Sequence, residues 1–142
     1  GYPEAIETVL GEPRASVFRQ LETSNLLKVQ GWNIYLGNQN IWELDFFSLD
    51  SFINLDDIKL QPSKLSGTGE IYLGSNLEIE KLSLSGNYEV TVSKDLSILV
   101  KGQANIPDQW LNASVGKLNY PDKTYTVIIE IIDGSQVIFK DG

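Results

Sequence analysis

Two stretches near the middle of the chain share one pattern: Leu65-Ser-Gly-Thr-Gly-Glu-Ile-Tyr-Leu73-Gly-Ser-Asn-Leu77 and Leu84-Ser-Gly-Asn-Tyr-Glu-Val-Thr-Val92-Ser-Lys-Asp-Leu96. They begin 19 residues apart, and each carries Leu-Ser-Gly, a glutamate, two apolar residues one position apart and a final leucine. Repeats of roughly 20 residues are typical of solenoid turns or of successive strands in a sheet. Two copies are fewer than the roughly three that a solenoid usually needs. The repeat therefore leaves two all-β architectures open, a stacked β-coil and a two-sheet β-sandwich.

Strand signals continue on both sides of the repeat. Apolar residues recur at every second position from Trp32 onward, and turn-forming Gly, Asn, Asp, Ser and Pro separate the runs. The predicted strands span residues 32–36, 41–47, 52–60, 70–73, 77–84, 88–92, 96–100, 125–132 and 136–139. Asp133-Gly134-Ser135 between two apolar runs predicts a hairpin. The nearly continuous apolar run Val127–Ile132 predicts a strand that is covered on both faces.

The first 29 residues have a different pattern. Pro3, the early glutamates and Gly11 predict a short helix over residues 3–11. The segment from Pro13 to Val29 fits extended structure better than helix, with turns at residues 23–25. We therefore divide the chain into residues 1–29, an N-terminal helix and connecting segment, and residues 30–142, a β domain, in one compact unit.

Composition excludes most catalytic chemistry. The 142 residues include no cysteine and no histidine, which removes thiolate nucleophiles, Ser-His-Asp arrangements and most zinc sites. A net charge of −8 opposes nucleic-acid binding. Asp45 with Asp50 and Asp56 with Asp57 offer oxygen ligands for calcium, but no Asp-x-Asp-x-Asp-Gly loop accompanies them. We predict no catalytic residues, no metal site and no cofactor.

Aromatic residues concentrate in one region of the chain. Trp32, Tyr35, Trp42, Phe46 and Phe47 lie close together in sequence, beside asparagine and aspartate. Large aromatic side chains mostly fill cores, although such a set also suits a platform for stacking on sugars. Trp110 stands in a predicted loop, where the core and the sugar-contact interpretations are about equally favoured.

Four segments resemble, in the same order, the C-terminal domain of LiaF-type bacterial cell-envelope stress regulators. Ile34-Tyr-Leu-Gly-Asn-Gln39 followed by Trp42-Glu-Leu44 is similar to a glycine-containing strand and a Trp-Glu-Leu signature of that family. Residues 49–60, 89–100 and 124–139 are similar to later strands. The resemblance covers residues 30–60 and 84–140, with residues 1–29 outside it.

The resemblance implies a non-enzymatic sensing and protein-interaction domain at the bacterial cell envelope. Members of that family are usually tied to the membrane by upstream helices and restrain a sensor histidine kinase. A protein partner, such as that kinase, is thus expected, with a tether upstream of residue 1. The candidate binding residues are Trp42, Glu43, Asp45, Asp56 and Asp57.

The alternative function is a secreted or surface β module that binds cell-wall glycan through Trp110 and Tyr120, or an adhesin segment. An exposed row of aromatic rings would favour glycan binding, and a buried aromatic core would count against it. The sequence leaves the oligomeric state and the side of the membrane open.

Overall fold

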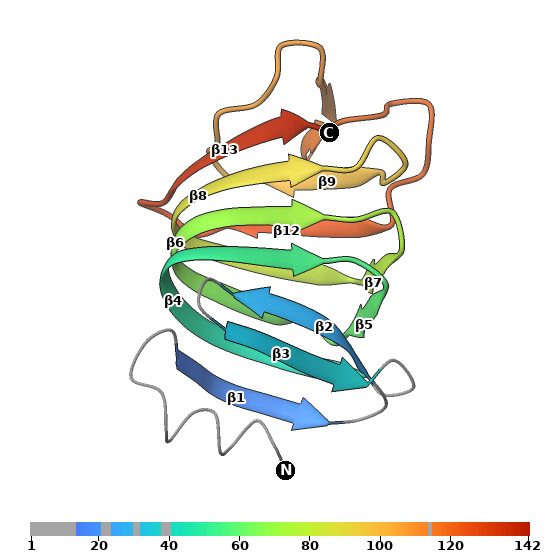
Figure 1. The fold of residues 1–142 in the computed structure, drawn as a ribbon. Helices are drawn as coiled ribbons and strands as arrows, with labels where there is room; N and C mark the ends of the chain where they lie inside the picture. The colour runs from blue at the N-terminus through green and yellow to red at the C-terminus, as the bar shows by residue number, and fades with distance from the viewer. Residues whose placement is uncertain (1–13, 21–23, 30–31, 38–40, 114) are drawn as a thin grey trace.

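The computed structural model describes residues 14–20, 24–29, 32–37, 41–113 and 115–142, with side chains from Ile41 on (Figure 1). Every regular element in these residues is a β-strand, so the all-β prediction is confirmed. Eleven strands form one mixed sheet, and two more form a separate pair. The helix predicted over residues 3–11 lies outside the described residues.

Three long strands build the centre of the molecule. β4 (Trp42–Leu55), β6 (Ser63–Leu73) and β8 (Lys81–Val92) curve around the same side and stack in parallel (Figure 1). In the pairing of β6 with β8, Leu65 lies opposite Leu84 and Glu70 opposite Glu89. These are the residues that the sequence repeat aligns, so the 19-residue period is confirmed as the register of the stack.

A second, shorter set of strands closes another side of each turn of chain. β5 (Ile58–Leu60) follows β4, and β7 (Leu77–Ile79) follows β6. The two pair in parallel, with Ile58 opposite Leu77, again 19 residues apart. The chain therefore repeats a whole turn, a long bent strand followed by a short one, rather than a single strand.

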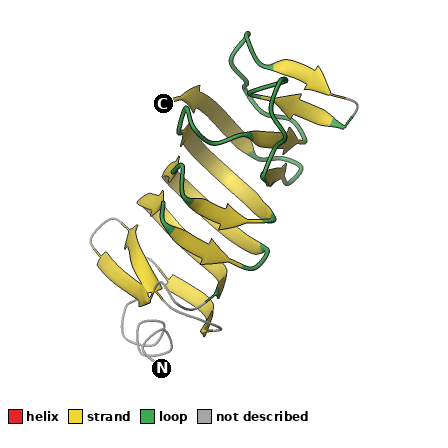
Figure 2. Ribbon diagram, turned by 90° about the vertical axis from the view of Figure 1, so that its right-hand side faces the viewer, coloured by secondary structure: helices red, strands yellow, loops and turns green. Residues whose placement is uncertain are grey.

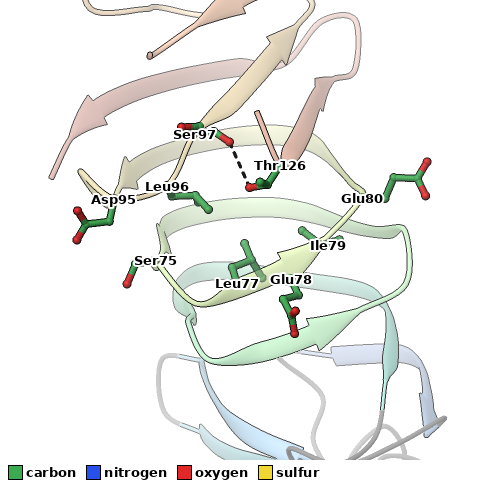
Figure 3. A pocket seen from close by; sticks show the side chains of 9 residues that line it. All are labelled: Ser75, Leu77, Glu78, Ile79, Glu80, Asp95, Leu96, Ser97 and Thr126. Atoms are coloured by element: carbon green, nitrogen blue, oxygen red, sulfur yellow. Dashed lines mark hydrogen bonds between the residues drawn. The ribbon is translucent and has the colours of Figure 1, made fainter. Parts of the chain in front are cut away.

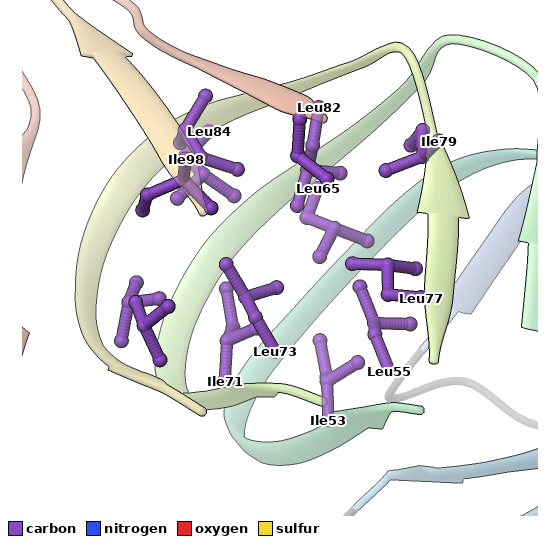
Figure 4. Packing of buried hydrophobic residues seen from close by; sticks show 14 of the residues in the cluster. Ile53, Leu55, Leu65, Ile71, Leu73, Leu77, Ile79, Leu82, Leu84 and Ile98 are labelled. Atoms are coloured by element: carbon purple, nitrogen blue, oxygen red, sulfur yellow. The ribbon is translucent and has the colours of Figure 1, made fainter. Parts of the chain in front are cut away.

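Alternation along the strands fills the interior of the stack. In β6 and β8, apolar residues at alternate positions of each half-strand are buried, while their neighbours point outward. Figure 4 shows Ile53, Ile71 and Leu73 pointing into a common interior with Leu55 and Leu77, and all five are buried. Full burial of an aliphatic side chain contributes about 1.5–3 kcal/mol, so this interior is the main source of stability.

Glycine occupies the bend of β6 and of β8. Gly67 and Gly86 lie opposite each other, with φ of 118° and 124°. A Cβ on Gly67 would lie 1.8 Å from the carbonyl oxygen of Ser48, and one on Gly86 would lie 1.9 Å from that of Gly67. The stacked backbones thus leave no room for a side chain at this corner. β4 turns the same corner with an irregular register and with Asp50 at φ 52°.

The C-terminal segment enters the stack out of order. β9 (Ile98–Lys101) does not pair with β8, because β12 (Val127–Ile131) lies between them, parallel to both. β13 (Gln136–Asp141) continues the segment along the second half of β8, and Ile138 bridges to Asn105. The last turn of the chain therefore fills a level that the chain has skipped earlier.

The hairpin predicted around Asp133-Gly134-Ser135 is wrong. β12 and β13 do not pair with each other; they pair in parallel with the first and second halves of β8. The N–H of Ser135 does donate to the carbonyl of Ile132 at 3.1 Å, so the residues form a turn. That turn is a corner of the coil, equivalent to the bend in β8, and not a reversal. The predicted covering of β12 is complete on its inner face and partial on its outer face.

Antiparallel strands lie at the two ends of the stack (Figure 2). β1 (Arg14–Gln20) pairs with the first half of β4, and β2 (Ser24–Val29) pairs with β3 (Trp32–Gly37). Extended structure in residues 14–20 and 24–29 is as predicted, whereas the turn predicted at Ser24 and Asn25 is wrong, because both lie in β2. At the opposite end, β10 (Leu111–Ala113) and β11 (Gly116–Leu118) form a hairpin on β9.

We expect Gly86→Ala to lower the free energy of unfolding by about 3 kcal/mol, because the added Cβ strains the backbone and meets the carbonyl of Gly67. Gly134→Ala is the matched control, since Gly134 also has a positive φ, of 87°, but no atom lies within 4 Å of the position that its Cβ would take. The control should lose about 1 kcal/mol. Urea unfolding monitored by circular dichroism measures both, and equal losses would contradict the steric account.

Candidate functional site

The outer face of β4 carries an unusual set of exposed side chains. Because side chains alternate along the strand, Glu43, Asp45 and Phe47 point away from the core that Trp42, Leu44 and Phe46 fill. Past the corner, Leu49 and Phe52 are also outside. The exposed fractions of Phe47, Leu49 and Phe52 are 39%, 44% and 42%. We call Glu43, Asp45, Phe47, Leu49 and Phe52 the β4 surface.

A shallow hollow of about 350 Å³ adjoins the acidic end of the β4 surface. Glu43 and Asp45 line it together with Lys64 and Lys81 from the next two levels of the stack. Asp45 lies opposite Lys64 in the register of β4 and β6. The hollow therefore presents both signs of charge to a partner, with the apolar part of the β4 surface beside it.

The two candidate tryptophans lie in the core. Trp42 is 4% exposed and Trp110 is 3% exposed. The indole N–H of Trp110 donates to a carboxylate oxygen of Asp141 at 2.9 Å, and its ring centroid lies 5.7 Å from that of Phe139. Neither ring presents a face to solvent on which a sugar could stack. The structure thus gives these two residues packing roles.

Asp56 and Asp57 form the corner between β4 and β5. One carboxylate oxygen of Asp56 accepts the backbone N–H groups of Asp57 and Asn76, at 2.9 and 3.0 Å. This contact ties two successive turns of the stack together, in the manner of an Asx turn. Asp57 is exposed, with φ 51°. The pair stands at the far end of β4 from Glu43 and Asp45, so the structure joins only the latter two in one surface.

Phe46 and Phe47 were both expected in the core from the sequence, which did not single out Leu49 or Phe52. The signal that separates them is the parity of the strand, because Phe46 shares the inward side with Trp42 and Leu44. Phe46 is 1% exposed, whereas Phe47 is not buried. Leu49 and Phe52 follow a corner, where an extra residue changes the parity.

Titratable groups in the described residues form no acid–base or metal constellation. No group of three or more carboxylates capable of holding a metal ion occurs among them. Burial raises the pKa of the Tyr88 hydroxyl above its ordinary value, and this hydroxyl has no hydrogen-bond partner within the described part of the chain. A hydrogen bond to Glu89 raises the pKa of Lys140 on the surface. Both groups lie apart from the β4 surface in sequence and on other strands.

Comparison with protein-family models, with curated proteins and with solved structures finds no match to the chain. The likeness to LiaF-type domains therefore stays a prediction from the residues that carry it. Within the described ranges, no helix has the length and apolar character required to cross a membrane.

Tyr88→Phe should leave stability at pH 8 unchanged or slightly higher, because the lost hydroxyl is buried and unpaired among the described residues. The pKa of Tyr88 is raised in the folded protein, so its contribution to stability is complete below pH 10 and is lost above it, as the unfolded chain ionises. The wild type should therefore weaken relative to the variant by up to about 1.4 kcal/mol per pH unit above pH 10.

Urea unfolding at pH 8 and at pH 11 tests this pH dependence. Tyr125→Phe is the control, because Tyr125 is 40% exposed and its hydroxyl is hydrated in both states. A constant difference between wild type and Tyr88→Phe at the two pH values would contradict the assignment.

Proposed function

We propose that the chain is a non-enzymatic protein-interaction domain, and that the β4 surface contacts its partner. The observation that carries the proposal is the exposure of Phe47, Leu49 and Phe52 on one strand, next to Glu43 and Asp45. Exposed apolar groups gathered on one element mark interaction sites more often than scattered ones do. Aromatic residues within a polar rim are also the usual composition of protein interfaces.

The scaffold suits such a role because it holds the surface in one conformation. Each outward side chain of β4 is backed by an inward neighbour, such as Leu44, Phe46 or Ile53, that is buried in the core. Little ordering of the backbone would accompany binding, which lowers its entropic cost. Glu43, Asp45 and the net charge of −8 would speed encounter with a basic partner.

We infer further that the architecture is a stacked β-coil rather than a two-sheet sandwich. The support is the parallel register of β4, β6 and β8 at 19-residue spacing, together with the parallel pairing of β5 with β7. A sandwich is instead built from two separate antiparallel sheets. The coil is a rigid support on which partner contact can be read out.

The partner that we propose is a sensor histidine kinase of the bacterial cell envelope, with this domain tethered near it by an upstream segment. The proposal rests on the resemblance to LiaF-type regulators. Binding of the domain to one state of the kinase would bias the kinase equilibrium toward that state, in proportion to the difference in affinity. No catalytic group is required for this mechanism.

The test is a pull-down from detergent-solubilised native membranes, with the domain as bait and mass spectrometry to identify bound proteins. Phe47→Ser with Phe52→Ser should reduce recovery of the kinase about tenfold, because loss of aromatic contacts costs roughly 1.4 kcal/mol or more. Leu111→Ser with Val115→Ser is the control, since both residues are more exposed and lie on the hairpin at the opposite end. Equal recovery with both variants, or equal loss, would contradict the β4 surface as the binding site.

A second candidate function is binding of cell-wall glycan, and a groove beside β13 favours it. The groove has a volume of about 580 Å³ and is lined by Gln103, Asn105, Ser135 and Gln136, with Ile138 at its side. Uncharged amides and a hydroxyl suit the hydroxyl groups of a neutral saccharide. This site replaces the platform of Trp110, which is buried.

Co-sedimentation with insoluble cell wall measures glycan binding. Gln103→Ala with Gln136→Ala should reduce the bound fraction severalfold, because both amides are exposed in the groove and their loss removes hydrogen bonds of about 1 kcal/mol each. Gln109→Ala is a control amide outside the groove. Retention that does not change with the double variant would exclude this groove.

A further inference from the structure

One side of the coil is incomplete. β5 and β7 pair on this side, and β7 is the last strand of the sheet there. At the next level the chain would place residues 96–98 beside β7, 19 residues after 77–79. Instead its backbone is engaged elsewhere: the N–H of Leu96 donates to Ser93, and the carbonyl of Ser97 accepts from the N–H of Thr126, both at 3.0 Å. The outer edge of β7 has no strand beside it among the described residues.

The position of the missing strand is a groove of about 520 Å³ (Figure 3). Leu77 and Leu96 face it from below and above, and Thr126 stands on its far wall. Both leucines are otherwise buried, with exposed fractions of 4% and 3%. The groove therefore opens directly onto the apolar interior of the coil at the place where a third short strand would lie.

Acidic side chains surround the groove. Asp95 and Glu80 stand at its two ends, and Glu78 projects between them from β7 (Figure 3). Glu78 has an ion pair with Lys59 at 3.6 Å, across an exposed surface. Glu80 and Asp95 have no cationic partner among the described residues, and no lysine or arginine of those residues lines the groove. The field in the groove is thus negative, and it favours a positively charged occupant.

We propose that this groove binds a basic, extended peptide segment of a partner protein, which adds a strand to the free edge of β7. Main-chain hydrogen bonds to an exposed strand edge supply affinity in such complexes, and alternate side chains supply specificity. An apolar side chain would enter between Leu77 and Leu96, and the flanking lysine or arginine residues would face Glu80 and Asp95. A segment of three or four residues suffices, because β5 and β7 are three residues long.

This site is independent of the proposed function. It lies on a different side of the coil from the β4 surface, shares none of its residues, and would bind a short segment rather than a folded face. Strand addition also requires no change in the coil, because the residues above the groove already make their hydrogen bonds to Ser93, Asn119 and Thr126.

The experiment uses a fluorescein-labelled peptide, Lys-Val-Lys-Val-Lys, with blocked ends, titrated with the whole chain and followed by anisotropy. The matched probe is Glu-Val-Glu-Val-Glu, which we expect not to bind. Backbone amide shifts in the ¹⁵N-labelled protein locate the peptide, and we expect the largest changes in residues 77–80 and 95–97. Absence of binding by the basic peptide, or shifts confined to other residues, would overturn the proposal.

Charge and strand addition are tested separately. Glu80→Lys with Asp95→Lys should weaken binding about tenfold, whereas Asp122→Lys with Asp133→Lys, which changes the net charge equally at exposed positions, should change it less than about twofold. A peptide N-methylated at both valines removes main-chain donors and should lose binding. Equal effects of the two charge variants would reduce the result to attraction by the overall charge, and full binding of the methylated peptide would exclude strand addition.

Discussion

Parallel hydrogen bonding among β4, β6 and β8 in a fixed register is the constraint on which the other features depend. In-register stacking places equivalent side chains one above another, so that Phe46, Leu65 and Leu84 form one buried column. A slip of one residue would turn such a column to the solvent. The same register brings the bends together, and the close approach of the backbones there admits only glycine at positions 67 and 86. Core packing and corner chemistry are thus two consequences of one pairing.

The part of this structure that could be predicted is the part that repeats. The match between Leu65–Leu77 and Leu84–Leu96 contains the register, since each aligned pair within β6 and β8 is a pair of opposite residues. The order of the last turn could not be predicted in this way. A tight turn at Asp133-Gly134 has the same local propensity in a hairpin and at a corner, and only the long-range partner, β8, distinguishes them. Trp110 is a similar case, because its burial depends on Phe139 and Asp141.

The candidate site follows from the alternation that makes the core. One strand contributes Trp42, Leu44 and Phe46 inward and Glu43, Asp45 and Phe47 outward, so the aromatic and acidic composition of this segment divides between two environments. Composition alone therefore could not decide between a core and a binding surface. The strand parity decides it for residues 42–47, and the corner at residues 48–51, with its shift in register, sets the parity of the residues that follow.

The groove beside β7 arises from the same topology as the interleaved C-terminal segment. Because β12 occupies the position next to β8, the chain must leave that level at Ser97 to reach β9, and it returns to it only at Thr126. The two passages stay together through the hydrogen bond between these residues, so neither extends along β7. A segment from another molecule that paired with β7 would repeat the contact that β7 makes with β5 and would cover Leu77 and Leu96. The free edge is therefore built into the chain order, and its acidic border selects which segments can use it.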